Sequence, residues 1–311
     1  CVGWRGGMIR NARQIDDIYT RAAAMHTTSD FPVIFESSIN RALESRYATA
    51  EPTYRRIARK QNFRDFRPHT TVKQGDFPML LKVLEGGEIK YGTFVEGKEA
   101  VQAFSYARAI SISRQMLIND DLGSIARLLS DYGTTVALME EVVFYTQAFN
   151  AVLSDNKTVF HADHGNLAAP GTAIDVVNVG KARTAMAKQK AFGSDNVLLS
   201  NKAKILLVGP DKLTEAEMLI ASITPATVAN VNIFSGKLDV LDSGQIAGNS
   251  WHTFADPNLG SNYRWGYLDG YEAPRVRTDE PFGVQGFAMS VEHDFGVGAT
   301  DYRFGYKNPG A

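Results

Sequence analysis

A mixed α+β fold is what this sequence predicts, and three stretches carry that prediction. In residues 122–150, apolar side chains recur at three- and four-residue steps, as they do along one face of an α-helix. In residues 102–112, larger side chains alternate with Ala and Ser, which is the period of a β-strand. Residues 151–270 then mix short apolar runs with helical segments. The chain of 311 residues is therefore expected to combine helices and sheet, with a discontinuous domain.

The first third of the chain is expected to be helical and then extended. Residues 8–28 are polar and helical in character, and a second helix is expected at 36–49, closed by Glu51-Pro52. Residues 79–84, 89–95 and 102–112 have the pattern of strands, with turns at 85–88 and 96–99. They predict a long hairpin that returns into the helix at 122–150. A hairpin of this length is marginal alone, so we expect it to lie on another surface, such as a second copy of the chain.

The long helix comes next, followed by the inserted region. Asp120 and Asp121 stand at the start of the helix, where carboxylates cap free N–H groups, and the helix would be roughly 40 Å long. A helix is expected at 176–190, a strand at 205–208, and a helix beginning with a capping box at Thr214 and Glu217. A strand is expected at 237–241 and an aromatic, glycine-rich surface at 251–270. The chain should end in two strands, 287–291 and 300–306, separated by a glycine break at 295–298.

Composition bounds the class of protein. Apolar residues make up 44% and charged residues 22% of the chain, as in a folded globular protein. The sequence contains no run of 18 apolar residues, so it predicts no membrane-spanning helix. Residues 1–75 hold 13 Lys and Arg against 7 Asp and Glu, a charge of +6, whereas the remainder has 20 against 27, a charge of −7. A basic arm on an acidic body indicates self-association or contact with a polyanion, and a solvated basic helix pair is the alternative.

A basic stretch with interleaved aromatic residues lies at 54–66. Its aromatic residues are Tyr54, Phe63 and Phe66, and its basic residues include Arg55, Arg56, Arg59 and Lys60. This pattern fits an arm laid across a neighbouring subunit, with aromatic anchors and a rim of arginines. It also fits nucleic-acid binding, although no nucleic-acid-binding motif accompanies it.

The sequence contains one candidate metal site and no catalytic motif that we recognise. His161, Asp163 and His164 could offer three ligands, but their spacing is not that of a zinc protease, and a hydrogen-bonded loop is the simpler interpretation. Phosphate-loop, nucleotide-fold and nucleophile-elbow patterns are missing, and Cys1 is the single cysteine. Asp120 and Asp121 could form an acid/base pair, but adjacent helix positions diverge, which favours capping. We therefore expect no cofactor, no metal and no enzyme activity.

The order of several segments resembles the major capsid proteins of tailed bacteriophages, which have the Hong Kong 97 fold. Within them it is most similar to the Mu-like major head subunits found with a prohead protease. The segments are EGGEIKYG at 85–92, ISRQMLINDD at 112–121, TVFHADHGN at 158–166, LLVGP at 206–210 and GVGATDYR at 296–303. These segments are spread along the chain, and the resemblance extends over most of residues 30–311. Their order carries the resemblance, since no single motif is specific.

The resemblance implies a division of the chain and a set of partners. Residues 1–75 would be the N-terminal arm, 76–112 the extended loop, 113–150 with 271–311 the peripheral domain containing the spine helix, and 151–270 the axial domain. The subunit would form hexamers and pentamers of an icosahedral head around double-stranded DNA, contacted without sequence specificity. A prohead protease, a scaffold and a portal would be further partners, with assembly in the bacterial cytoplasm and the mature protein in the virion. No membrane contact is expected.

Eleven residues are candidates for contacts between subunits: Arg55, Arg56, Arg59, Glu85, Glu88, Lys90, Arg114, Asp120, Asp121, Trp251 and Trp265. Two alternative functions remain. One is an encapsulin-like shell that shares the fold and holds protein cargo, and the other is a metal-dependent hydrolase that uses the loop of His161, Asp163 and His164.

Overall fold

A computed structural model describes residues 30–72, 98–113, 122–191, 197–221, 237–279 and 286–311. These residues fall into two compact units. The first holds the described parts of Cys1–Ala50, Ser105–Ala137 and Ala273–His293, and the second holds those of Glu51–Phe104, Leu138–Glu272 and Asp294–Ala311. The expected helix at 8–28, the first two hairpin strands and the caps Asp120 and Asp121 lie outside the described residues, as do Glu85, Glu88, Lys90 and Arg114.

In the first unit, helix α2 (Asp30–Thr49) packs on strand β8 (Arg275–Asp279) and on helix α5 (Leu122–Val143). Asn40 joins α2 to the strand, since its side-chain oxygen accepts a hydrogen bond from the Val276 N–H at 2.7 Å. Gly133 of α5 lies against α2 so closely that an added Cβ would stand 2.6 Å from the Leu43 carbonyl oxygen. A glycine that weakens an isolated helix is therefore needed here for helix packing.

The larger sheet has the order β1-β7-β9-β3-β2, and β8 pairs with β9. Its strands are β1 (Arg59–Lys60), β2 (His69–Val72), β3 (Lys98–Ser113), β7 (Tyr263–Tyr267) and β9 (Gly286–Ala299). The expected glycine break at 295–298 is wrong, because β9 continues through it. An added Cβ at Gly296 would lie 2.7 Å from the Gln102 carbonyl oxygen, and one at Gly298 would lie 2.8 Å from Val101. These glycines permit close packing on β3 rather than a turn.

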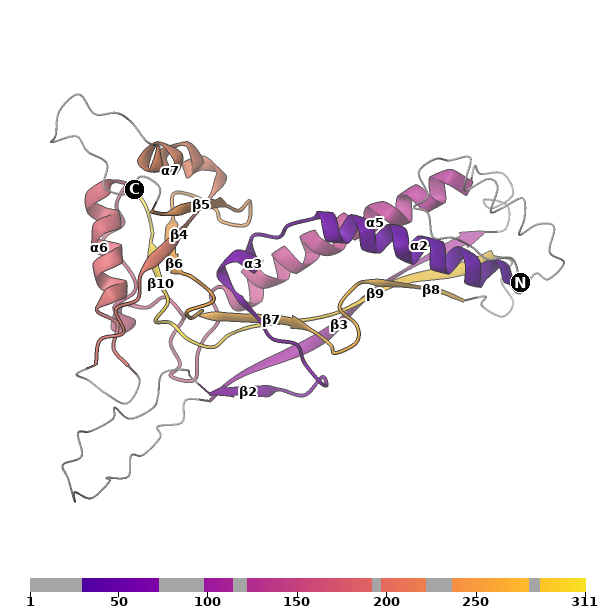
Figure 1. The fold of residues 1–311 in the computed structure, drawn as a ribbon, viewed down its shortest axis with the longest axis horizontal. Coiled ribbons are helices and arrows are strands. Elements are labelled where there is room, and N and C mark those ends of the chain that lie inside the picture. Colours follow the sequence, from indigo (N-terminus) through magenta and orange to yellow (C-terminus); the bar gives the residue numbers. More distant parts are fainter. Residues whose placement is uncertain (1–29, 73–97, 114–121, 192–196, 222–236, 280–285) are drawn as a thin grey trace, which may run out of the picture. The chain divides into compact units, whose positions relative to one another are not determined.

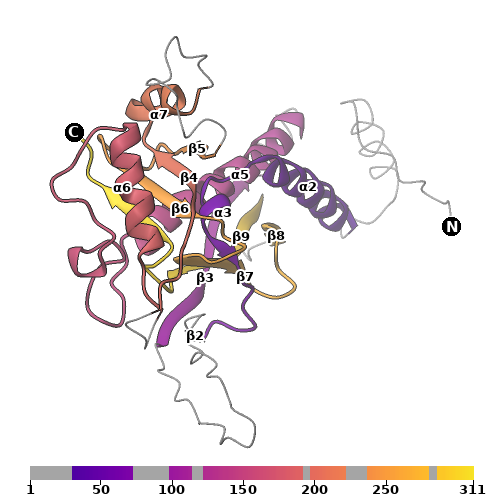
Figure 2. The same cartoon turned by 60° about the vertical axis from the view of Figure 1, so that its left-hand side comes forward.

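The smaller sheet belongs to the second unit and has the order β10-β6-β4-β5. It comprises β4 (Ala203–Val208), β5 (Asp239–Asp242), β6 (Trp251–Ala255) and β10 (Gly305–Asn308). Helices α6 (Val176–Ala187) and α7 (Leu213–Ile220) lie beside it in Figures 1 and 2. Their apolar residues, including Val179, Met186 and Leu219, form one core with Leu206, Val208 and Trp251 of the strands. Burial of this apolar surface holds the two layers together.

Several expected elements occur with shifted ends. The long helix is α5, extended by a π-helix, η1 (Phe144–Ala148), so the helical path ends close to the expected residue 150. Helix α2 begins at Asp30 rather than residue 36. The capping box at Thr214 is wrong, because α7 starts at Leu213, directly after the 3-10 turn η3 (Pro210–Lys212), and its N-cap Lys212 makes no side-chain cap hydrogen bond. The turn therefore places Thr214 inside the helix.

The aromatic stretch at 251–270 also differs from expectation. It forms β6 and β7 and contributes buried side chains instead of a surface. Strand β10, near the C-terminus, pairs with β6, so residues 305–308 share a sheet with the expected axial domain. The division into arm, extended loop and two domains stays a prediction. None of the described helices combines the length and apolar character that crossing a bilayer requires.

Candidate assembly surface

The basic stretch at 54–66 begins with a short helix, α3 (Tyr54–Ile57), that is bound to the spine helix α5. Glu140 of α5 is fully buried and accepts hydrogen bonds from the Tyr54 hydroxyl at 2.7 Å and from Arg55 at 3.2 Å. Arg55 also donates to the Tyr267 hydroxyl at 3.0 Å. Burial, followed by the nearby Glu140 carboxylate, raises the pKa of Tyr54. The buried carboxylate therefore has charged and neutral donors, as a stable buried charge requires.

The next residue of the spine helix, Glu141, holds the start of α3. One carboxylate oxygen accepts the Thr53 N–H at 2.7 Å, and the other contacts the Thr53 hydroxyl and accepts from Ser243 at 2.8 Å. Thr53 makes no side-chain cap of its own, so Glu141 supplies the negative charge at this helix start. The two glutamates together fix residues 53–55 on α5.

The expected aromatic anchors are wrong for two of three residues. Tyr54 is 0% exposed and Phe63 is 2% exposed, and both lie in the core of their own subunit. Tyr54 stacks on Phe144, with ring centroids 5.3 Å apart, while β1 pairs in parallel with β7. Phe66 is 44% exposed and remains available. Residues 54–63 of the basic stretch are thus part of the folded unit, because Tyr54 and Phe63 are buried in its core.

The basic side chains of this stretch border a groove of about 340 Å³. Its lining includes Lys204 of β4, Asp239 of β5 and Trp265 of β7, together with the basic residues Arg55, Arg56, Arg59 and Lys60. The guanidinium of Arg55 lies 5.4 Å from the Trp265 ring centroid, within cation–π range. Arg56 reaches Asp239 at 3.5 Å, and both side chains are about half exposed. The groove therefore brings together four of the predicted contact residues: Arg55, Arg56, Arg59 and Trp265.

The two predicted contact tryptophans are placed differently. Trp251 is 0% exposed and its indole N–H donates to the Thr172 carbonyl at 2.9 Å, so it cannot touch another subunit directly. Trp265 is 8% exposed and donates to the Ala58 carbonyl at 3.2 Å. Trp251 is therefore corrected from a contact residue to a core residue, because all five residues of β6 are buried. Trp265 is also mostly buried, as are four of the five residues of β7, and it lines the groove with little exposed surface.

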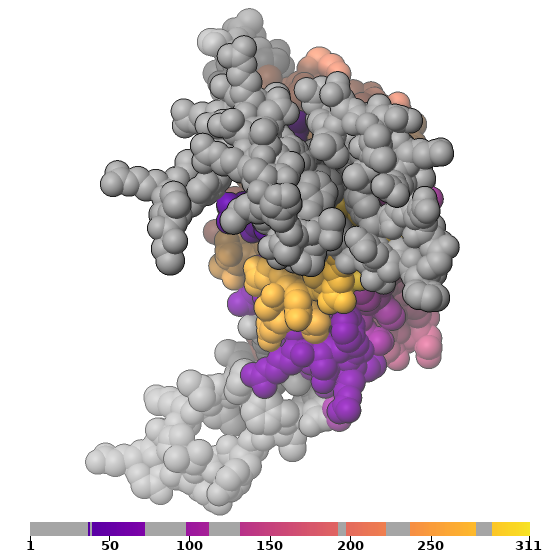
Figure 3. All heavy atoms as spheres, turned by 90° about the vertical axis from the view of Figure 1, so that its right-hand side faces the viewer, coloured from indigo at the N-terminus to yellow at the C-terminus, as the bar shows by residue number. Residues whose placement is uncertain are grey.

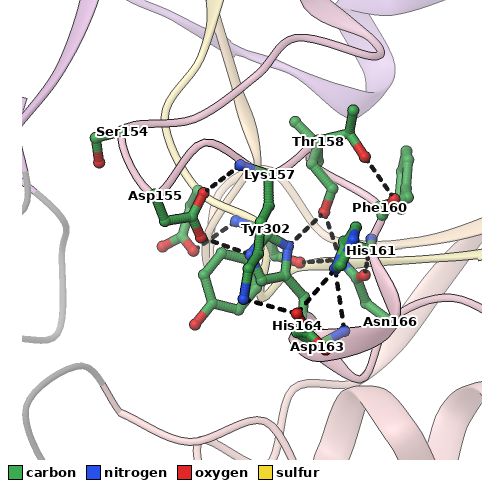
Figure 4. A network of polar contacts seen from close by, with 12 residues as sticks. Ser154, Asp155, Lys157, Thr158, Phe160, His161, Asp163, His164, Asn166 and Tyr302 are labelled. Atoms are coloured by element: carbon green, nitrogen blue, oxygen red, sulfur yellow. Dashed lines mark hydrogen bonds and ion pairs between the residues drawn. The ribbon is translucent and has the colours of Figure 1, made fainter.

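The loop with His161, Asp163 and His164 is a hydrogen-bonded turn that includes the 3-10 helix η2 (Ala162–His164), as Figure 4 shows. The ring nitrogens of His164 face the Val159 carbonyl at 3.2 Å and the Asp155 carboxylate at 2.7 Å. Its ring stacks on Tyr302, with centroids 3.9 Å apart. The loop is thereby fastened to the turn before β10.

The other two residues of this loop have separate partners. Asp163 pairs with Lys157 at 2.8 Å, and this hydrogen bond lowers the pKa of Asp163 and raises that of Lys157. His161 accepts the Asp163 N–H on Nδ1 at 3.2 Å. Within the described part of the chain, no group of three or more His, Cys, Asp or Glu side chains could hold a metal ion. The arrangement is that of a structural turn.

Some residues that organise this region were not identified from the sequence. Glu140 and Glu141 carry no local pattern beyond two acidic residues on a long helix. Their partners Thr53 to Arg55 are more than 80 positions away, with Tyr54 and Glu140 separated by 86. Two adjacent carboxylates that interrupt an apolar helix were the available signal. Purple and orange segments, far apart in the sequence, are both visible on the face drawn in Figure 3. The isolated bridge between Phe63 and Leu268 is a contact between two such distant parts of the chain.

Comparison with known proteins identifies the fold and the family. The profile of a family described as "Phage capsid protein" matches residues 97–308. The structure is similar to the capsid of an empty GTA particle, with a TM-score of 0.56, 11% identity, and coverage of 84% of this chain and 90% of that one. No curated protein sequence matches.

Two further solved structures have the same fold. The procapsid of bacteriophage JBD30 has a TM-score of 0.51 at 12% identity and covers 91% of this chain and 75% of the other. The capsid of Ralstonia phage GP4 has a TM-score of 0.51 at 10% identity, covering 82% and 87%. At these identities the likeness concerns the fold. With the family profile spanning most of the chain, it shows that this protein belongs to the phage capsid protein family and is a structural shell protein with an α+β fold of the Hong Kong 97 type.

Proposed function

We propose that this chain is the major capsid subunit of a tailed-phage head, forming hexamers and pentamers of an icosahedral shell around double-stranded DNA. The observation that carries the proposal is the family match over residues 97–308. In a closed shell each contact can be weak, because many contacts form together around every capsomer. The finer assignment, a Mu-like head subunit that works with a prohead protease, a scaffold and a portal in the bacterial cytoplasm, belongs to the same proposal.

The charge of the chain supports loose contact with DNA. Residues 76–311 carry a charge of −7, so a shell built mostly from this part would not hold phosphate strongly. The DNA inside would then be confined by closure of the shell rather than by tight binding. Contacts between subunits would involve basic residues at the surface, and among the described candidates these are the exposed Arg56 and the partly buried Arg59.

Electron microscopy of the purified protein, across salt concentration and pH, tests the proposal. Closed icosahedral shells or rings of five and six subunits are expected. A homogeneous monomer or small dimer under all conditions would refute the shell function. Shells isolated from a phage-producing cell should contain nuclease-protected double-stranded DNA; protein cargo and no DNA would instead indicate an encapsulin-like compartment.

The N-terminal arm has its own test. A variant lacking residues 1–30 should form fewer or less stable shells than the full chain, because a basic arm adds contacts between neighbours. Thermal disassembly followed by light scattering measures this. Shells of equal yield and stability would show that residues 1–30 do not act as an assembly arm.

A further inference from the structure

The turn that follows β7 contains the single Asp–Gly pair of the chain. Asp269 and Gly270 are the only adjacent Asp and Gly, in that order, among the 311 residues. Both are exposed, and they form a two-residue turn in which the Tyr271 N–H donates to the Leu268 carbonyl at 2.9 Å. Gly270 has a φ of +84°, which glycine adopts without strain. Asp and Gly are common in turns for such reasons, but side by side they also permit a reaction of the main chain.

The reaction joins the backbone nitrogen of Gly270 to the side chain of Asp269. A bond forms between this nitrogen and Cγ of Asp269, and the amide hydrogen and the carboxyl hydroxyl leave together as water. Water then opens the resulting five-membered succinimide ring at either carbonyl. One opening restores aspartate, and the other gives isoaspartate, in which the main chain runs through Cγ. Water is released and then consumed, so the modification needs no enzyme and no other reactant.

The turn leaves both reacting groups available. Within the described part of the chain, the Asp269 carboxyl group makes no hydrogen bond or ion pair, and the Gly270 N–H has no acceptor. A Cβ built on Gly270 would meet no atom within 4 Å, so the space around the turn is open. Glycine also has no side chain that could obstruct its own nitrogen. Exposed turns with few contacts open at low free energy, which allows the geometry of ring closure to be reached.

Two other aspartates show what prevents the reaction. After Asp242, the N–H of Ser243 donates to the Val208 carbonyl at 3.1 Å, so the nitrogen is held within the sheet. Asp256 precedes Pro257, which has no N–H to lose. The Asp–Gly turn therefore differs from these positions in its following residue and in its free N–H.

We propose that Asp269 is a site of spontaneous isomerisation, at which this turn converts to isoaspartate as the protein ages. The added main-chain carbon would lie between two attachments of the turn to the basic stretch. Before it, the Asp269 N–H donates to the Phe63 carbonyl at 2.8 Å, and after it, Glu272 pairs with Lys60 at 2.7 Å. A longer chain between these attachments shifts one against the other, so isoaspartate should loosen residues 60–63.

Incubation of the full-length unassembled subunit at neutral pH, followed by trypsin digestion, tests the proposal. The tryptic peptide 265–275 contains one aspartate, Asp269. Its isoaspartyl form should appear as a second chromatographic peak of unchanged mass that accepts a methyl group from protein isoaspartate methyltransferase. The rate in the folded subunit should be within about tenfold of the rate in urea, because the exposed turn opens readily. Asp269→Glu is the matched control: it keeps the charge but needs a larger ring, so no second peak should form.

A second variant and an internal comparison make the result decisive. Asp269→Asn passes through the same ring with loss of ammonia, so it should react faster and show the small mass gain of deamidation. Absence of the second peak from the folded wild type, whether or not the chain in urea reacts, would refute the proposal. Equal isoaspartate at Asp242 in the folded subunit would also refute it, since the bonded N–H of Ser243 should prevent ring closure. Trypsin should cut the isomerised protein faster after Lys60; an unchanged rate would overturn the loosening of residues 60–63.

Discussion

His252, on strand β6, is buried with no hydrogen-bond partner in the described part of the chain, and it should make the subunit sensitive to acid. The side chain is 1% exposed, and its ring lies 4.9 Å from the Phe149 ring and 5.3 Å from the Phe160 ring, measured between centroids. Neither ring nitrogen has a hydrogen-bond partner among the described residues. Burial, aided by the nearby Lys307 ammonium, lowers the pKa of His252 from 6.5 to about 3.

The loss of stability in acid follows from the difference in the pKa of His252 between the folded and the unfolded chain. In the unfolded chain the imidazole gains its proton near pH 6.5, whereas in the folded subunit it stays neutral until about pH 3. The stability associated with neutral His252 is thus complete above pH 6.5 and is lost as the pH falls toward 3. At pH 5 the unfolded chain is favoured by 1.5 pH units of proton binding, which is about 2 kcal/mol.

Urea denaturation of the unassembled subunit at pH 8 and pH 5 measures this loss. The wild type should lose about 2 kcal/mol more than His252→Leu over this interval, because leucine binds no proton. At pH 8 the leucine variant should be at least as stable, since it removes two unpaired buried nitrogen atoms. His69→Gln is the control, because His69 is partly exposed and lies beside Asp65 at 3.1 Å.

Equal pH dependence of the wild type and His252→Leu would refute the reasoning. It would mean that the imidazole reaches solvent or a polar partner when the pH falls. A loss of acid sensitivity in His69→Gln as large as in His252→Leu would show that burial does not decide the effect.

Three further predictions concern the stability of the folded subunit. Gly296→Ala should destabilise the subunit by about 3 kcal/mol or prevent folding, because the added Cβ would meet the backbone of β3. Gly180→Ala is the control: its Cβ would enter open space on α6, so it should stabilise the subunit by about 0.5–1 kcal/mol, and thermal melts compare the two variants. Glu140→Gln should destabilise by roughly 1–3 kcal/mol by weakening the bonds from Tyr54 and Arg55, measured by denaturation of the unassembled subunit. Trp251→Ala should cost about 3–5 kcal/mol and give insoluble subunits rather than folded, unassembled ones, as fractionation and circular dichroism would show.

The spine helix and the core strands could be predicted because their signals are local. The apolar period of residues 122–150 appears as α5 and η1, and the run at 205–208 appears inside β4. Glycine was harder to interpret, since the same residue permits a turn or a close approach. At Gly296 the neighbouring strand, nearly 200 positions earlier in the chain, decides for close approach.

The candidate contact residues show the same limit. Arg55, Arg56 and Arg59 line one groove, and their role in contacts between subunits stays a prediction. Trp251 and Trp265 looked equally suitable for contacts, yet both are buried. Nothing in the immediate sequence distinguishes an aromatic side chain that faces another subunit from one that faces its own core.

By itself, the sequence determined the α+β class, the spine helix, the resemblance to phage capsid proteins and the uneven charge, because composition, periodicity and motif order are properties of the chain. Only the tertiary structure decided which side chains are exposed and which charges already have partners. Tyr54 and Phe63 are core residues, and Glu140 and Glu141 secure residues 53–55, because these contacts join positions far apart in the chain. Burial and ion pairing depend on such distant neighbours, so they arise only when the chain folds.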